Sequence, residues 1–297
     1  MPSQSEIRQQ IADQIVDALS CGDVPPWRKP WTNDPNAGLP ANVSSGNRYR
    51  GVNPILLEIS RMKQGFESKW WATYRQIQQL GESVCKGQKG TSIIFYKKYK
   101  VTKPDPKTCE EKEESIQVLR YFTVFNVEQT TGLKHLKVGF SNSNDIPIAD
   151  RYREAQALIE SIGPDIRHGG NQAYYSPAND RIQLPFIRQF ESESEYFHTT
   201  FHELIHWSGA SNRLNRNELS YGFEELVAEI GACFTSTEVG IPVTEDLSNV
   251  KSYLGCWLKA IKTEPQFIFK AASHASKAAD YLLAFQPSVK PEAVPAA

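Results

Sequence analysis

The sequence predicts an α+β protein of two domains, a small antiparallel-sheet domain followed by a second domain rich in helices. Two observations support this division. Long stretches of β-branched and aromatic residues lie before residue 141, whereas most stretches with helical periodicity follow it. The charge is also divided, with 20 basic and 14 acidic side chains in residues 1–140 and 13 and 20 in residues 141–297. The formal net charge of −1 therefore averages two halves of opposite sign.

The first half should begin with an amphipathic helix at residues 5–19, because Ile7, Ile11 and Ile15 recur at helical spacing. Two short helices and two strands should follow, the helices at residues 53–62 and 71–80 and the strands at 91–101 and 116–128. Between the strands, prolines and a run of Glu and Lys are typical of a solvated hairpin loop. These elements make residues 1–140 the expected first domain.

Residues 141–150 are polar and should link this domain to a second one at residues 151–285. Helices are expected there at residues 151–162, 194–208, 223–239, 250–261 and 271–283, and short strands at 173–175 and 181–184. The strand at 181–184 is a candidate for an exposed sheet edge that pairs with an extended peptide, with an ordinary strand as the alternative. The tail at 286–297 contains three prolines and is expected to be disordered.

Composition narrows the class of protein. The chain is 40% hydrophobic and 23% charged, as in ordinary globular proteins, and no apolar run approaches the roughly 18–20 residues that span a bilayer. The N-terminus lacks the basic-then-apolar order of a signal peptide. Five scattered cysteines form neither a disulfide framework nor a Cys-x-x-Cys metal pattern. We therefore expect a cytoplasmic protein without a membrane partner.

The motif with the clearest chemistry is His202-Glu203-Leu204-Ile205-His206, inside a stretch with helical periodicity. Residues four apart project from one face of a helix, so both imidazoles can bind one metal ion. Zn²⁺, or another divalent ion such as Mn²⁺, would bind here, and Glu203 would take a proton from a metal-activated water. His198 lies one turn earlier and is expected to pack or to support a ligand.

A catalytic zinc site needs a third protein ligand, and the helix expected at 223–239 offers two. Glu225 and Glu229 are four residues apart on one face of that helix. The distance from His206 to Glu225 suits zinc peptidases whose third ligand is a glutamate on a second helix. Either carboxylate can be the ligand, with the other supporting it from behind.

The first half combines positive charge with aromatic rings. Residues 24–103 hold 14 basic and 4 acidic side chains, and rings repeatedly stand beside cations. Single-stranded nucleic acid is bound by cations along its phosphates and by rings that stack on its bases. The alternative is that half of these rings are core. Adjacent Trp70 and Trp71 cannot both point inward from a strand, whereas at the end of a helix they can. The candidate contacts are Trp27, Arg28, Lys29, Trp31, Arg48, Tyr49, Arg50, Lys69, Trp70, Trp71, Tyr74, Arg75, Lys86, Lys89, Lys97 and Lys98.

Both halves carry motifs of one known family. The segments RYRGVN at 48–53, WWATY at 70–74, KGQKGT at 86–91 and VFNVEQ at 124–129 resemble the N-terminal domain of ArdC-type antirestriction proteins, which TraC-type primases of conjugative plasmids share. The second half, with His202–His206 and the acidic helix after it, resembles the zincin-like metallopeptidase domain that follows in such proteins. Tyr175, Asp180, Ile182 and Pro185 fit the same domain.

The resemblance implies a plasmid-encoded protein that binds single-stranded DNA and protects incoming DNA from host restriction during conjugation. It also implies His202 and His206 as ligands, Glu203 as the catalytic acid–base group, and a host protein or restriction enzyme as a partner of the second domain. Peptide cleavage is not implied by the motif alone. The alternative is a non-catalytic DNA-binding or replication accessory protein whose metal site only braces the fold.

Overall fold

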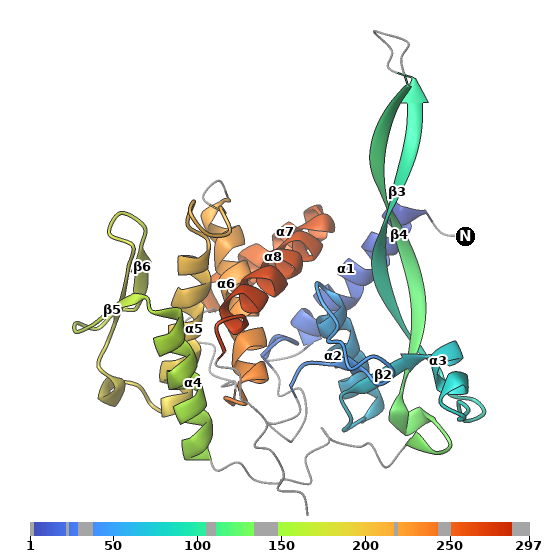
Figure 1. Ribbon diagram of the computed structural model, residues 1–297, viewed down its shortest axis with the longest axis horizontal. Helices are drawn as coiled ribbons and strands as arrows, with labels where there is room; N and C mark the ends of the chain where they lie inside the picture. Colours follow the sequence, from blue (N-terminus) through green and yellow to red (C-terminus); the bar gives the residue numbers. More distant parts are fainter. Residues whose placement is uncertain are drawn as a thin grey trace, which may run out of the picture.

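The structure is a computed structural model of the chain (Figure 1). It describes residues 3–21, 24–28, 38–104, 111–133, 148–216, 219–242 and 251–286. Several predictions lie outside the described residues: Lys29 and Trp31, the side chains of Lys97 and Lys98, residues 141–147 of the expected linker, and residues 287–297 of the expected tail. Helix α4 begins at Ile148, within the stretch expected to be linker.

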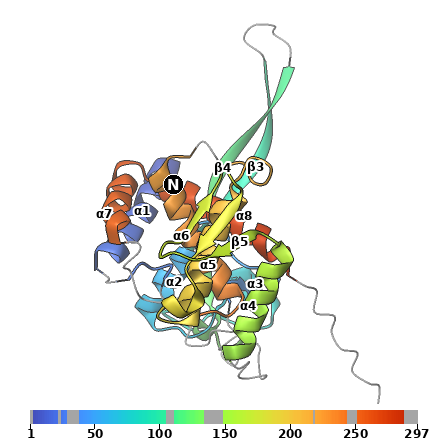
Figure 2. The ribbon, with the colours of Figure 1, turned by 90° about the vertical axis from the view of Figure 1, so that its left-hand side faces the viewer.

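The first half contains one four-stranded sheet with the strand order β1-β2-β4-β3. Strand β3 pairs with β4 over its whole length, so the two strands form a long antiparallel hairpin that extends away from the helices (Figures 1 and 2). The elements are α1 (Gln4–Cys21), β1 (Ala41–Asn42), α2 (Asn53–Gln64), β2 (Trp70–Thr73), α3 (Tyr74–Gln79), β3 (Thr91–Pro104), β4 (Glu111–Asn126) and the 3-10 turn η2 (Val127–Gln129).

The helix predicted at residues 71–80 was wrong in its first turn. Trp70–Thr73 pairs with the end of β4 as strand β2, and the helix begins only at Tyr74. Thr73 explains the switch, because its hydroxyl accepts a hydrogen bond from the backbone N–H of Gln76 and caps the helix there.

The second half is built around two helices, α5 and α6, that pack against each other. Its elements are α4 (Ile148–Ile162), β5 (Asp165–His168), β6 (Tyr174–Ser176), β7 (Arg181–Leu184), η4 (Ile187–Gln189), α5 (Glu193–Ser208), α6 (Tyr221–Glu238), α7 (Lys251–Thr263) and α8 (Gln266–Leu283). The short strand β5 was missed, because the exposed segment Asp165–His168 shows no apolar alternation.

The three-stranded sheet of this half corrects one expectation. Its order is β5-β7-β6, so the strand at 181–184 is central and has a neighbour on each side. Burial agrees with this position, since Ile182 and Leu184 are fully buried. Strand β6 is an edge of the sheet.

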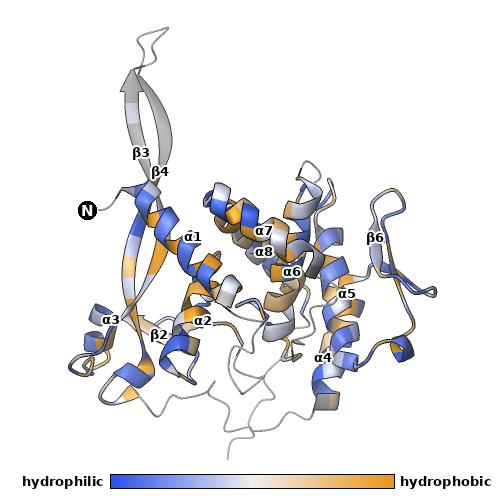
Figure 3. Cartoon of the chain, turned by 180° about the vertical axis from the view of Figure 1, so that it is seen from behind, coloured by the Kyte–Doolittle hydropathy of each residue, from blue (hydrophilic) through white to orange (hydrophobic). Residues whose placement is uncertain are grey.

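The two halves share one continuous hydrophobic core. Helix α1 contacts α7 and α8, and its isoleucines belong to the same cluster of buried side chains as α5, α6 and α8. Figure 2 shows α1 beside α7, and Figure 3 shows how polar and apolar residues alternate along α1. The first helix therefore packs against elements of the second half, and a domain boundary at 140 stays a prediction. Among the described residues, no helix has both the length and the apolar character required to cross a bilayer.

Candidate metal centre

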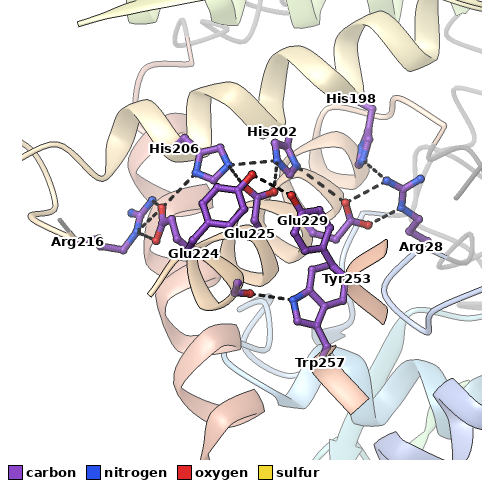
Figure 4. A network of polar contacts seen from close by, with 12 residues as sticks. Arg28, His198, His202, His206, Arg216, Glu224, Glu225, Glu229, Tyr253 and Trp257 are labelled. Atoms are coloured by element: carbon purple, nitrogen blue, oxygen red, sulfur yellow. Dashed lines mark hydrogen bonds and ion pairs between the residues drawn. The ribbon is translucent and has the colours of Figure 1, made fainter. Parts of the chain in front are cut away.

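Helix α5 presents His202 and His206 on one face, as their spacing predicted. Ser192 caps the helix by accepting a hydrogen bond from the backbone N–H of Glu195 at 3.1 Å. The residues between the histidines, Leu204 and Ile205, are fully buried and fix the rotation of the helix. As a result, the two Nε2 atoms lie 3.2 Å apart and face the same point (Figure 4).

Helix α6 approaches α5 closely and brings a carboxylate to that point. A Cβ on Gly231 would lie 2.9 Å from Cδ1 of Ile205, so a larger residue there would push the helices apart. The Glu225 carboxylate lies 3.6 Å from Nε2 of His202 through Oε2 and 3.6 Å from Nε2 of His206 through Oε1. These three side chains offer two nitrogens and an oxygen, all within 4.8 Å of one another.

The two neighbouring glutamates face the opposite ring nitrogens. Glu229 Oε2 lies 4.0 Å from Nδ1 of His202, and Glu224 Oε1 lies 3.5 Å from Nδ1 of His206. Of the two glutamates that the sequence left as alternatives, Glu225 therefore faces both Nε2 atoms and Glu229 lies behind one ring. Glu224 was missed as a site residue. Each metal-binding histidine usually has a carboxylate that orients its ring, so two histidines and one glutamate ligand indicate three acidic residues on this helix.

Each supporting carboxylate is held by an arginine. Arg216 donates to Glu224 through Nη2 at 2.8 Å, and it also donates to the carbonyl of Ile205. Arg28 donates hydrogen bonds to both oxygens of Glu229, from Nη2 to Oε2 at 3.0 Å and from Nε to Oε1. Arg28 was predicted to contact DNA, and this prediction was wrong: the residue is only 4% exposed and lies inside the second half. No sequence signal joins residues 201 positions apart.

Burial and charge act against each other in this network. Burial alone would raise the pKa of Glu229, but the hydrogen bond and charge of Arg28 hold it below its usual range. Burial opposes ionisation of Glu224 as well, and His206 and Arg216 lower its pKa. Burial, with the nearby Arg28 charge, lowers the pKa of His198 to about 3, so this histidine is neutral near pH 7.

A cleft of about 1060 Å³ opens over the two histidines. Glu203 lines it and is 6% exposed, next to His202 in the chain. On the α7 side, Tyr253 stacks on Trp257 with ring centroids 5.7 Å apart, and its hydroxyl lies 2.9 Å from that of Tyr221. The cleft therefore combines several carboxylates, three imidazoles and hydroxyl groups in a space large enough for a substrate chain.

The opposite wall of the cleft includes β6, whose Tyr174 and Tyr175 line it. This wall is fastened to the end of α5. The Tyr175 hydroxyl donates to Asp180 at 2.9 Å, Arg213 pairs with Asp180, and the Arg213 guanidinium lies 3.9 Å from the ring centroid of Trp207. Burial, together with the hydrogen bond to Asp180, raises the pKa of Tyr175 to about 12. These contacts give Tyr175 and Asp180 a structural role.

The residues predicted to bind DNA separate into buried and exposed groups. Trp27, Trp70 and Trp71 are 0%, 7% and 1% exposed, so their rings are closed to bases. Both faces of β2 are covered by apolar side chains, so adjacent Trp70 and Trp71 are both buried, contrary to expectation. Tyr49 is half-buried and packs against the Trp71 cluster.

Two further arginines predicted to bind DNA pair with acids of the second half. Arg48 lies 2.7 Å from Glu238 at the end of α6, and Arg50 lies 3.2 Å from Asp280 on α8. Two of the basic side chains of the first half are therefore neutralised by acidic side chains of the second half.

The exposed group contains Tyr74, Arg75, Lys86 and Lys89, while Lys69 is half-buried over the ring of Trp70. Another exposed pair of rings, on the β3–β4 hairpin, was not among the predicted DNA contacts. Phe95 is 59% and Phe122 45% exposed, with centroids 6.3 Å apart, and exposed Arg120 is directly opposite Phe95 in the strand register. We call these three residues the hairpin platform. Strand alternation would not have identified Phe95, because Ile93 and Ile94 are both buried and Phe95 and Tyr96 are both exposed.

Each half of the chain matches a known protein family. Residues 5–125 match the family described as the N-terminal domain of anti-restriction factor ArdC, and residues 153–274 match a zincin-like metallopeptidase family. A DNA primase TraC of Escherichia coli is 34% identical over 96% of the chain, which spans only 20% of that primase.

Two crystal structures of the antirestriction ArdC protein from the R388 plasmid superpose on the chain. The metal-free structure has a TM-score of 0.77 at 35% identity and covers 95% of this chain and 98% of the other. The Mn(II)-bound structure has a TM-score of 0.75 at 34% identity, with coverages of 96% and 99%.

Proposed function

The chain belongs to the ArdC family of antirestriction proteins, and from this premise we propose that it is a divalent-metal peptidase that also binds single-stranded DNA and protects DNA entering a cell by conjugation. The observation that carries the enzymatic part is the group of three donors, Nε2 of His202, Nε2 of His206 and the Glu225 carboxylate, beneath the cleft. Such an enzyme would act in the cytoplasm.

The donor set fits a divalent metal. Two imidazoles and one carboxylate are ligands that both Zn²⁺ and Mn²⁺ accept, and a three-residue set leaves positions for water and substrate. Both Nδ1 atoms face carboxylates, which is the usual support for a metal-binding histidine. His202, His206 and Glu225 would hold the ion, while Glu224 and Glu229 would orient the rings.

The bound metal supplies a Lewis acid and a water of lowered pKa. Glu203 lies beside His202 in the same cleft, and its carboxylate would accept a proton from the attacking water and return it to the leaving amine nitrogen. The Tyr253 hydroxyl, across the cleft on α7, would donate a hydrogen bond to a bound carbonyl oxygen.

The cleft favours an extended peptide as the substrate. Strand β6 forms an edge of its sheet and lines the cleft, so a substrate chain could pair with it through backbone hydrogen bonds. A host protein, such as a restriction enzyme, would then be the partner of this half.

Single-stranded DNA is the ligand that best suits the exposed part of the first half. The hairpin platform offers two rings beside an arginine, and Arg75, Lys86 and Lys89 add exposed positive charge. Rings can stack on unpaired bases, which a duplex keeps inside its stack. The DNA-binding surface would therefore include Phe95 and Phe122 in place of the buried tryptophans.

The test of the enzymatic proposal is Glu203→Gln in the full chain. This variant should keep the affinity for Mn²⁺ and Zn²⁺ and for a labelled oligonucleotide, because Glu203 is not among the three donors. It should lose the protection of conjugated DNA measured in a restricting host. Full protection by Glu203→Gln would instead support the alternative, a DNA-binding protein whose metal site only braces the fold.

A further inference from the structure

The metal centre of the second half includes a buried residue from the first half. Arg28 lies within residues 5–125, which match one family, whereas the glutamate that it holds lies within 153–274, which match another. The structure buries both partners, with side-chain exposures of 5% for Arg28 and 0% for Glu229. This contact crosses from one family unit into the other at the candidate metal centre (Figure 4).

The segment that carries Arg28 is itself anchored in the second half. Pro25, Pro26 and Trp27 are all buried. Trp27 packs edge-on against Trp257 of α7 with centroids 6.4 Å apart, and the Trp257 indole N–H donates to the carbonyl of Gly222 at the start of α6. The position of the guanidinium is thus determined by packing on both α7 and α6.

The contact fixes the orientation of one carboxylate. Oε2 of Glu229 accepts from Arg28 Nη2 at 3.0 Å and is also the oxygen that faces Nδ1 of His202. Because Arg28 bonds both oxygens of Glu229, the carboxylate cannot rotate without breaking one of the two bonds. With Nδ1 directed at Glu229, Nε2 of His202 is directed at Glu225 and His206.

We propose that Arg28 is a positioning residue of the metal centre, through which the first half of the chain sets the affinity of the second half for its metal. The proposal rests on the proposed metal centre and adds its dependence on the first half. Arg28 would act through Glu229 on the imidazole of His202, without touching metal or substrate. Loss of a group that supports a metal ligand typically weakens metal binding about 10- to 100-fold.

A control is provided by a second arginine of the first half that pairs with a glutamate of α6. Arg48 pairs with Glu238 at 2.7 Å, and Glu238 is the last residue of α6, beyond Glu229 and the glutamates that face the histidines. If Arg28 acted only by clamping the two halves together, Arg48→Gln and Arg28→Gln should affect metal binding alike.

The experiment measures dissociation constants for Zn²⁺ and Mn²⁺ on the full chain by competition with a chelator. Wild type is measured first; if it binds neither ion, the proposed metal centre itself is wrong. With binding established, Arg28→Gln should weaken it about 10- to 100-fold. Arg28→Lys, which keeps the charge but not the two-pronged contact, should fall between, and Arg48→Gln should equal wild type. Equal affinities for wild type, Arg28→Lys and Arg28→Gln would overturn the proposal.

Two further measurements distinguish a positioning role of Arg28 from a general effect on the stability of the fold. Glu229→Gln should weaken binding, and adding Arg28→Gln to it should cause no further loss, because Arg28 acts through that carboxylate. In zinc-saturated protein, the Nδ1–H proton of His202 should exchange slowly with solvent in wild type and faster in Arg28→Lys. The corresponding proton of His206, supported by Glu224, serves as the internal reference. Unchanged exchange at His202 in a variant with weakened binding would contradict the positioning role. Arg28→Lys keeps these tests available if Arg28→Gln does not fold.

Discussion

The cleft over the two histidines and the hairpin platform differ in how far their functional groups are buried and held in place. In the cleft, Glu229 is fully buried and Glu224 has an 18% exposed side chain, and each is held by a nearly buried arginine. On the platform, Phe95 of β3 and Phe122 of β4 are roughly half exposed, and their rings contact each other across the two strands of the hairpin. Distances between groups are therefore set in the cleft before any ligand arrives, whereas the platform is open on one side.

This difference indicates two kinds of ligand. A preorganised set of donors suits a small ion, because the cost of arranging the groups is met by folding. An open pair of rings suits a polymer that is itself flexible and can adapt its bases to the surface. Four predictions test how far this contrast holds.

The largest effect is expected from the candidate ligand on α6. Glu225→Ala should weaken Mn²⁺ and Zn²⁺ binding by more than the about 10- to 100-fold expected for Glu224→Gln, because Glu225 alone faces both Nε2 atoms. Calorimetric titration measures both. If Glu229→Gln abolished binding while Glu225→Ala retained it, the ligand assignment would be reversed.

The next effect concerns the platform. Phe95→Ala and Phe122→Ala should each weaken binding of a labelled single-stranded oligonucleotide by about 5- to 150-fold, the loss of one stacked base at ~1–3 kcal/mol. Metal affinity should not change. Phe186→Ala is a matched control, because Phe186 is a 44% exposed ring in the second half. Wild-type binding should also weaken steeply with salt. Equal losses in all three variants would remove the platform from the DNA-binding surface.

The next prediction concerns the pH dependence of stability and the buried, neutral His198. Its pKa is about 3 in the folded protein and near 6.5 in the unfolded chain, so below pH 6.5 the unfolded chain takes up a proton that the folded protein does not. The stability due to neutral His198 is complete above pH 6.5 and falls by up to about 1.4 kcal/mol per pH unit from there toward pH 3. Denaturant titrations at several pH values should show a shallower acid loss for His198→Gln. Identical slopes would contradict a neutral His198.

The smallest effect is expected where the two halves meet at the surface. Arg50 and Asp280 form an ion pair whose side chains are 68% and 31% exposed. Exposed pairs of this kind contribute ~0.2–1 kcal/mol, so Arg50→Gln should lower the free energy of unfolding by no more than that. Chemical denaturation measures it, with Asp280→Asn as the reciprocal variant. A loss of several kcal/mol would mean that this contact is part of the core between the halves.

Much of the fold and part of the site were predictable because they depend on neighbours in the chain. The spacing of His202 and His206 determined that both rings share a face of α5, since backbone hydrogen bonds fix the helical period. The same holds for α1, α2 and the paired strands β3 and β4. Charge and aromatic content, in contrast, did not distinguish exposed Phe95 from buried Trp27, because burial depends on what covers a side chain.

The sequence by itself determined the helices, the hairpin and two of the three candidate donors, all consequences of local periodicity. Only the tertiary structure decided that Glu225 rather than Glu229 faces both Nε2 atoms, because that depends on how α6 is rotated and how closely it packs on α5. It also decided that Arg28 is buried against Glu229 instead of exposed, because a guanidinium pairs with whichever carboxylate the fold brings within about 3 Å, here one 201 positions away.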